Sequence, residues 1–317
     1  MGKNKLTVLM PVYNEAKYLR SSIQSILDQT YKDFEFLILN DDSTDNSEEV
    51  ILSFNDKRIK YVKTERLGLS SLLNYGVSIS LGDIIARMDS DDIALPGRLE
   101  KQLKFIEDKD ENYISSAWFA SFKGKKLLHF VKHPTSDYKI KRQLNTSNPI
   151  CHPLAIFYKS FFLKLRGYDE ELDCLEDHNL WLEARNRAEF GNIPEILLLK
   201  REKENSLGEL ERNKPKAFIY NLLNSHFEED YYKNSSAVKD DKLKLEYLYG
   251  SRNKLRKRLL RNNIMSIKRS YYFIYSFLPE FIFNKKLNNH IKWKANKFIS
   301  LFSFERKKLK KILAKYE

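Results

Sequence analysis

Two hydrophobic periodicities alternate along the first hundred residues of the chain. Strand-like runs recur at 6–12, 34–39, 59–62 and 83–88, and the first of them is continuously apolar, as expected for a strand buried on both faces. Between these runs, apolar residues recur every three or four positions, which indicates an amphipathic helix after each strand. This alternation predicts an α/β fold with a mostly parallel central sheet, covered by helices on both faces.

Local signals mark where the helices start. Asp45 and Glu48 have the spacing of a capping box, which predicts a helix through Val50 and Ile51. Pro96 stands at the predicted start of the helix that follows the fourth strand. Beyond residue 110 the pattern is weaker, and it marks two strands and one helix, at about 116–122, 154–158 and 176–188.

Charge divides the chain into two parts. Of the net charge of +13, residues 1–200 carry 28 Lys and Arg against 30 Asp and Glu, whereas residues 201–317 carry 28 against 13. The strand pattern also ends near residue 200. We therefore predict an α/β domain over 1–205 and a basic, mainly helical region over 206–317.

Neither a signal peptide nor a spanning helix is predicted. The apolar run that starts at Leu6 is too short for a signal peptide. The nearest candidate for a spanning helix, 271–283, is interrupted by a Pro-Glu pair. Cys151 and Cys174 have no metal-binding or disulfide spacing, so we expect reduced thiols in a cytoplasmic protein.

Acidic and amide side chains follow three of the predicted strands. They are Tyr13 to Glu15 after the first strand, Asn40 to Ser43 after the second, and Asp89 to Asp92 after the fourth. Ligands of open α/β sheets bind outside the carboxyl ends of the strands. Asp and Asn are also common turn and cap residues, so one such cluster alone is more often structural. Three clusters at one sheet edge favour a binding site.

Asp89 and Asp91 form a pair of carboxylates separated by one residue. Both can approach a hard cation such as Mg²⁺ or Mn²⁺, which also binds substrate phosphates. The pair alone is weak evidence, but here it follows an apolar strand and precedes Pro96-Gly97-Arg98. It is the predicted metal site.

Several motifs occur in the order and spacing of a known family. They are Pro11–Glu15, Asn40–Asp45, Gly68–Gly76, Met88–Leu99, Asn148–Pro153, Gly167–Glu170 and Glu176–Trp181. Over about residues 5–200 the chain resembles family 2 glycosyltransferases of the GT-A fold, of the bacterial surface-polysaccharide type. The resemblance implies a Rossmann-like domain that binds a nucleotide sugar.

Individual roles are implied by the same resemblance. The residues expected to bind the nucleotide sugar are Pro11, Val12, Tyr13, Glu15, Asp41, Asn74 and Asp89. Apart from the resemblance, Arg66 and Arg87 are weaker candidates for contact with the diphosphate, because an Arg at a strand end is commonly a surface residue. Asp41 matches the position that hydrogen-bonds uracil, and Asp91 is the better candidate of its pair for direct contact with Mn²⁺ or Mg²⁺. The chain departs from the usual pattern at Asn40, where Asp is common, and at Asp42, where Gly is common.

Asp177 matches the catalytic base of the family. An attacking hydroxyl must lose its proton as it bonds to the sugar, and a positioned carboxylate can accept that proton. One such displacement inverts the anomeric centre, so we expect a β-linkage from an α-linked UDP-sugar. The structural alternative for Asp177 is a carboxylate that stabilises a helix N-terminus.

Acceptor binding has three weaker candidates, each with a structural alternative. They are His152, Glu176 and Trp181. A lone His is more often structural, a Glu at this position can cap a helix, and a Trp on a helix is equally at home in the core.

The basic region carries aromatic residues between its cations. Residues 251–317 contain 19 Lys and Arg against three acidic residues. This composition favours peripheral contact with an anionic membrane surface. Nucleic-acid binding is a weaker alternative, because no motif for it is present, and a solvated basic helical face is a third.

These observations converge on one function. We expect a non-processive, inverting, metal-dependent transferase that moves a sugar from a UDP-sugar to a glycan or lipid-linked glycan in polysaccharide, capsule, O-antigen or lipooligosaccharide synthesis. It would lie in the cytoplasm, peripherally on the inner face of the membrane. The alternatives are a sugar-nucleotide-binding module without catalysis and, less favoured, a basic nucleic-acid-binding protein. A processive synthase is rejected, because a Gln-x-x-Arg-Trp motif and spanning helices are not found in the sequence.

Overall fold

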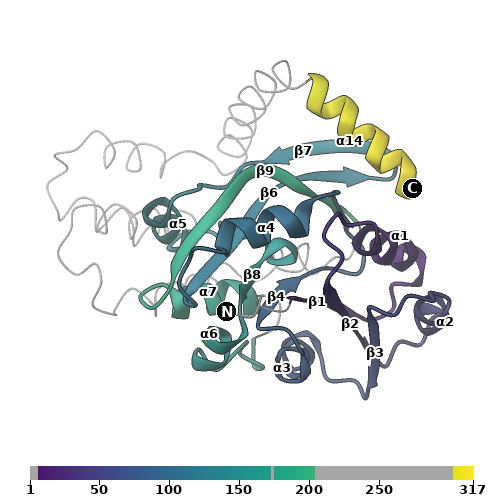
Figure 1. The fold of residues 1–317 in the computed structure, drawn as a ribbon, viewed down its shortest axis with the longest axis horizontal. Coiled ribbons are helices and arrows are strands. Elements are labelled where there is room, and N and C mark those ends of the chain that lie inside the picture. Colours follow the sequence, from purple (N-terminus) through teal and green to yellow (C-terminus); the bar gives the residue numbers. More distant parts are fainter. Residues whose placement is uncertain (1–5, 173–174, 204–302) are drawn as a thin grey trace, which may run out of the picture.

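The computed structural model describes residues 6–172, 175–203 and 303–317 (Figure 1). The predicted alternation in the first half is confirmed as β1 (Leu6–Val12), α1 (Ala16–Leu27), β2 (Phe34–Asp41), α2 (Ser47–Leu52), β3 (Ile59–Thr64), α3 (Leu69–Ile79) and β4 (Ile84–Arg87). These strands lie in the order β3-β2-β1-β4, and all their pairings are parallel. The predicted α/β class is therefore confirmed.

Burial explains the continuous apolar run of β1. Every residue of β1 is buried, because α1 and α2 cover one face of the sheet and α3 covers the other (Figure 1). Gly76 allows the close approach of α3, since a Cβ there would lie 2.5 Å from Leu9 Cδ1 and 2.7 Å from Leu39 Cδ1. The carboxyl ends of these parallel strands consequently meet at one edge.

The second half adds shorter and partly antiparallel elements. They are β5 (Ile93–Ala94), α4 (Arg98–Ile106), β6 (Tyr113–Lys123), β7 (Lys126–Val131), α5 (Asp137–Leu144), the 3-10 helix η1 (His152–Leu154), β8 (Ile156–Tyr158), α6 (Lys159–Lys164), α7 (Glu176–Ala184) and β9 (Glu189–Arg201). The sheet continues as β4-β8-β6-β9-β5, with β7 on β6. Only β6 and β9 pair in parallel here, whereas the other pairs are antiparallel.

The predicted capping box is wrong in its detail. Helix α2 begins at Ser47 with Asn46 at its N-cap. The carboxylate of Asp45 accepts hydrogen bonds from the backbone N–H groups of Ala16, at 2.9 Å, and Ser47, at 3.0 Å. Asp45 therefore ties the start of α1 to the start of α2, a contact between separate segments that local spacing does not reveal.

The basic region is described only at its end, as α14 (Ser303–Tyr316). Its Leu309 and Leu313 are buried against the apolar surface of β5, β6, β7 and β9. The predicted boundary near residue 205 and the helices predicted over 206–302 lie outside the described residues. Among the described helices, none has the length and apolar character that a membrane span requires.

Candidate active site

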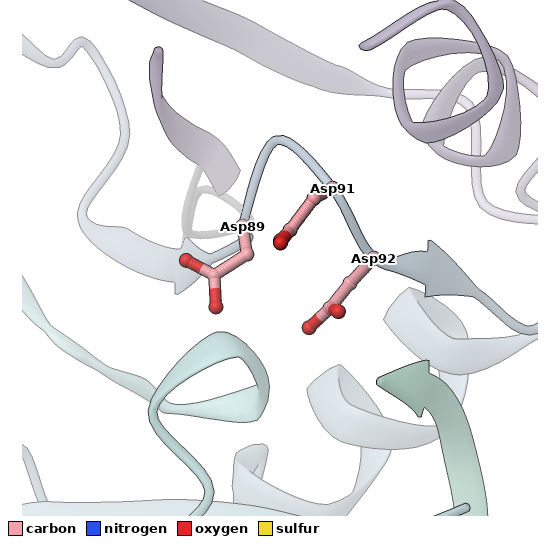
Figure 2. Close-up of side chains that lie close together, drawn as sticks. All are labelled: Asp89, Asp91 and Asp92. Atoms are coloured by element: carbon pink, nitrogen blue, oxygen red, sulfur yellow. The ribbon is translucent and has the colours of Figure 1, made fainter. Parts of the chain in front are cut away.

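Three carboxylates gather in the loop that follows β4. Ligand atoms of Asp89, Asp91 and Asp92 all lie within 4.8 Å of one another (Figure 2). The predicted pair is thus joined by Asp92, to which the sequence analysis gave no role. We call Asp89–Asp92 the acidic loop.

Asp92 lies deepest of the three, at 1% exposure. Its Oδ1 accepts the backbone N–H of Arg201 at 2.8 Å, whereas its Oδ2 has no hydrogen-bond partner among the described residues. Burial raises the pKa of Asp92 well above its usual value, and the charges of Asp91 and Asp89 raise it further. A buried carboxylate oxygen without a partner beside two more carboxylates is an environment that a cation would stabilise.

The backbone before the acidic loop is fixed by a fully buried arginine. Arg98 donates to the carbonyl of Arg87 at 2.6 Å and to Gln102 Oε1 at 2.8 Å. Burial lowers the pKa of Arg98 to about 10. Gly97, with φ of 79°, supplies the left-handed turn that precedes this helix. The first residue of α4 therefore fixes the backbone that leads into the acidic loop.

Cations surround the acidic loop. Lys203, just beyond β9, pairs with Glu15 and lies 2.9 Å from Asp91 Oδ2. Arg87 is only 3% exposed and pairs with Asp89, and its Nε has no hydrogen-bond partner in the described part of the chain. Burial raises the pKa of Glu15, and Lys203 opposes that effect. The site therefore carries opposite charges at short range.

The end of β1 and the loop after β3 form a second part of the site. Pro11 and Val12 are buried and carry Tyr13, which is 41% exposed, to the sheet edge. The guanidinium of Arg66 lies 3.4 Å from the Tyr13 ring centroid and pairs with Asp41. Arg66 therefore lies beside the predicted base-binding residues Tyr13 and Asp41.

Asp41 is almost fully buried, and its carboxylate organises the loop before α3. It accepts the backbone N–H groups of Leu67 at 2.7 Å and Gly68 at 3.1 Å. The neighbouring Asn40 accepts the N–H of Ser43 at 3.0 Å, and Asp42 has φ of 56°. Asp42 thus adopts the left-handed conformation that the usual glycine would favour.

Asn74 acts at a distance from the acidic loop. Its Nδ2 donates to the carbonyl of Tyr168 at 2.9 Å and to Glu170 Oε1 at 3.0 Å, and its Oδ1 accepts the N–H of Tyr168 at 2.8 Å. Both ends of the amide are therefore used to hold the segment that carries Tyr168. The structure gives Asn74 a supporting contact, not a direct place among the carboxylates.

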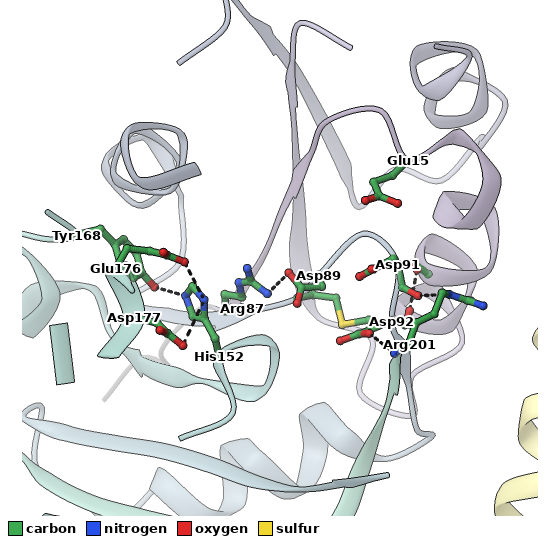
Figure 3. Close-up of polar contacts among 12 residues, drawn as sticks. Glu15, Arg87, Asp89, Asp91, Asp92, His152, Tyr168, Glu176, Asp177 and Arg201 are labelled. Atoms are coloured by element: carbon green, nitrogen blue, oxygen red, sulfur yellow. Dashed lines mark hydrogen bonds and ion pairs between the residues drawn. The ribbon is translucent and has the colours of Figure 1, made fainter. Parts of the chain in front are cut away.

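Helix α7 carries two acids to the same region. Asp177 Oδ2 accepts a hydrogen bond from Asn148 Nδ2 at 2.8 Å, and its Oδ1 accepts the N–H of His178 at 2.6 Å. Burial raises the pKa of Asp177, although the N–H of His178 lowers it in part. Burial also raises the pKa of Glu176, as does the charge of Asp177. In Figure 3, Arg87 lies between these acids and Asp89.

His152 faces both acids from η1. Its Nδ1 lies 3.9 Å from a carboxylate oxygen of Glu176 and of Asp177, and its Nε2 lies 2.9 Å from the Tyr168 hydroxyl (Figure 3). Burial holds the pKa of His152 well below its usual value and raises that of Tyr168. Burial thus favours the neutral forms of both side chains.

A family model matches about half of the chain, including β1 to β4 and the acidic loop. The model described as "Glycosyl transferase family 2" matches residues 7–166. The chain belongs to this family.

Relatives and solved structures agree with that membership. This family 2 glycosyltransferase is 37% identical over 237 residues to an uncharacterized glycosyltransferase of Methanocaldococcus jannaschii, over 72% of the chain and 81% of the relative. It is 35% identical to the O-antigen biosynthesis glycosyltransferase WbnJ of Escherichia coli, over 61% of the chain and 78% of the relative.

The fold resembles that of S. aureus TarS 1-349, solved with UDP-GlcNAc. The TM-score is 0.61 at 18% sequence identity, and the match covers 86% of this chain and 79% of the TarS chain. The fold also resembles the mannosyltransferase PcManGT of Pyrobaculum calidifontis, solved with GDP-Man and Mn²⁺, with a TM-score of 0.59, 15% identity and coverage of 99% and 86%.

One expectation for this glycosyltransferase is corrected by burial. Trp181 is 1% exposed and packs edge-on against His152, with ring centroids 6.4 Å apart. Its ring has no free face for an acceptor sugar, because α7 turns it into the core. The alternative weighed for Trp181, a core aromatic, is the one that the structure supports.

Two cations at the end of β9 contact the acidic loop and were not predicted from the sequence. Arg201, the last residue of β9, donates from Nε to the carbonyl of Asp91 at 2.8 Å, and Lys203 lies 2.9 Å from Asp91 Oδ2. The available signal was a pair of cations at the end of an apolar strand, but these positions lie where the net positive charge of the C-terminal part begins.

Proposed function

We propose that this glycosyltransferase moves a sugar from a UDP-sugar to a hydroxyl of a glycan or lipid-linked glycan, with inversion and without processivity. The observation that carries the proposal is the joint occurrence of the acidic loop and Asp177, connected through buried Arg87. A module that only binds a sugar nucleotide has no need for a second, partly exposed carboxylate in the same region as the cation ligands.

Mn²⁺ or Mg²⁺ is the proposed cofactor. Asp89, Asp91 and Asp92 would hold it, and the unpartnered Oδ2 of Asp92 fits a cation ligand. A bound divalent cation supplies positive charge that stabilises the leaving diphosphate. Lys203 lies 2.9 Å from Asp91 Oδ2, and it would retain its contact with Glu15 when the cation binds.

Asp177 is the proposed base. Its carboxylate accepts the proton of the acceptor hydroxyl while the hydroxyl oxygen bonds to the anomeric carbon and the bond from that carbon to the diphosphate breaks. The electron pair of the broken bond leaves with the nucleoside diphosphate. Because the attack is a single displacement, an α-linked donor yields a β-linked product.

Tyr13 and Asp41, at the ends of β1 and β2, support a nucleobase site there. An exposed aromatic ring offers a stacking surface, and Arg66 would move from it or extend it when a base binds. Structural neighbours were solved with UDP-GlcNAc and with GDP-Man, so both bases belong in the test.

A panel of UDP- and GDP-sugars tests the function. Hydrolysis or transfer is measured with Mn²⁺, with Mg²⁺ and with EDTA. We expect turnover of a UDP-sugar that EDTA abolishes. Failure to bind or turn over any member of the panel would refute the proposal. Turnover of GDP-sugars alone would mean that the donor is a GDP-sugar and not a UDP-sugar.

Peripheral membrane contact on the cytoplasmic face is part of the proposal. The relative WbnJ is named for O-antigen biosynthesis, which supports a surface-glycan acceptor. Helix α14 exposes Lys307, Lys308, Lys310 and Lys311, a surface that complements anionic lipid. Flotation with anionic vesicles should carry the protein upward, and replacing these four lysines with Gln should reduce it. Equal flotation with neutral vesicles would exclude the electrostatic contact.

A further inference from the structure

Helix α14 packs back onto the α/β domain beside α1 (Figure 1). Leu313 is 1% exposed within the apolar surface that includes Phe122 of β6. Lys315 Nζ lies 2.5 Å and the Tyr316 hydroxyl 2.7 Å from Asp28 Oδ2. The end of α14 is thus anchored by an apolar contact and by two polar contacts to α1.

A third polar contact joins α14 to β9. Glu317 Oε1 lies 2.6 Å from Arg201 Nη2, and the two side chains are 16% and 3% exposed. The guanidinium of Arg201 also lies 4.2 Å from the Tyr18 ring centroid and 4.6 Å from that of Phe122. Two aromatic rings and one carboxylate therefore fix its orientation.

Arg201 in turn contacts the acidic loop twice. Its Nε donates to the carbonyl of Asp91 at 2.8 Å, and its backbone N–H donates to Asp92 Oδ1 at 2.8 Å (Figure 3). One bond fixes the backbone of the loop, and the other fixes the carboxylate orientation of its deepest acid. A single residue thus connects the end of α14 to the proposed cation ligands.

We propose that Glu317 and Arg201 are positioning residues through which docked α14 sets the cation affinity of the acidic loop. The inference rests on the proposed function, since it concerns the same cation. Without the Glu317 carboxylate, the buried guanidinium keeps its charge, loses the acid with which it pairs and stays next to the acidic loop, whose backbone it contacts at Asp91. It then competes with the cation and releases the carbonyl of Asp91.

The test compares Glu317→Gln with Asp28→Asn in the full chain. Asp28→Asn removes a charge at the neighbouring contact, keeps an acceptor for Lys315 and Tyr316 and leaves the Glu317–Arg201 pair in place, which makes it the matched control. The dissociation constant for Mn²⁺ alone is measured from the electron paramagnetic resonance signal of free Mn²⁺. Loss of a residue that orients metal ligands typically costs about 10–100-fold in affinity. We expect a loss in this range for Glu317→Gln and little change for Asp28→Asn.

Hydrogen exchange of the metal-free protein provides a second measurement. Glu317→Gln should accelerate amide exchange at Arg201 and across 88–95, whereas Asp28→Asn should not. Wild-type Mn²⁺ affinity and exchange in Glu317→Gln would overturn the inference, as would equal effects of both variants. If the wild type binds no Mn²⁺, the proposed cofactor fails, and the exchange comparison still decides whether Glu317 holds the loop.

Discussion

Asn148 donates a hydrogen bond from Nδ2 to Asp177 Oδ2 over 2.8 Å, from the segment before η1 to the first turn of α7. A donor to a carboxylate stabilises its charged form, so this bond lowers the pKa of Asp177 against the effect of burial, which raises it. The amide therefore keeps the proposed base available at lower pH than burial alone would permit.

Asn148→Ala should move the acid limb of the pH profile of kcat/KM to higher pH. With the donor removed, the pKa of Asp177 rises, and a higher pH is needed to ionise the base. Asn148→Asp should move the limb further, because it adds a negative charge and keeps an acceptor for the N–H of Ile150. Asn112→Ala, which removes a distant amide bond to Arg187, is the control. An unmoved limb in both Asn148 variants would argue against Asp177 as the titrating base.

Asp177→Asn should lower kcat by about 10²–10⁴-fold, the usual contribution of a general base. The substitution keeps the shape of the side chain and an acceptor for the N–H of His178, so the melting temperature should change little. Donor affinity, measured by calorimetry with the nucleoside diphosphate, should also persist. Glu176→Gln is the matched comparison and should cost less. If Asp177→Asn retains normal turnover while Glu176→Gln loses it, the base is Glu176.

Strand-end chemistry was predictable from the sequence because parallel strands bring their carboxyl ends to one edge. Asp89 and Asp91 follow β4 directly, so their meeting depends only on the local pattern. The role of Asp92 was less evident from the sequence, since its carboxylate is oriented by the N–H of Arg201, more than a hundred residues away. Contacts between distant segments are the information that periodicity lacks.

The same limit explains the supporting residues. Asn74 and Tyr168 each belong to a recognisable motif, but only the fold shows that one holds the backbone of the other. Trp181 could be assigned to the core or to an acceptor site from its motif, and the rotation of α7 decided between them. Sequence thus predicted which segments matter better than what each side chain contacts.

Asp92→Asn should separate the effect of the acidic loop on metal-free stability from its role in cation binding. In the metal-free protein the change removes a buried carboxylate next to two others, and the new side chain can still accept from Arg201. We expect an equal or higher melting temperature without metal. A cation at 100 times its dissociation constant stabilises a protein by about 2.7 kcal/mol, and tenfold weaker binding would remove about 1.3 kcal/mol of this.

The Mn²⁺-induced rise in melting temperature should accordingly be smaller in Asp92→Asn than in the wild type. Asp108→Asn, which removes an exposed acid outside the loop, controls for net charge. A full Mn²⁺ response in Asp92→Asn would show that Asp92 is not a ligand. A strong loss of metal-free stability would show that its carboxylate is structural.

Asp42→Gly tests the turn that follows β2. Asp42 has φ of 56°, a conformation that costs an L-residue about 1 kcal/mol and glycine almost nothing. The greater entropy of glycine in the unfolded chain offsets part of that relief. We therefore expect the free energy of unfolding to change by no more than about 1 kcal/mol. Asp42→Val, whose branched side chain disfavours positive φ, should destabilise the protein by more than that. The measurement is urea unfolding of the three proteins. Equal stability of the Gly and Val variants would mean that the backbone at this position does not require the left-handed conformation.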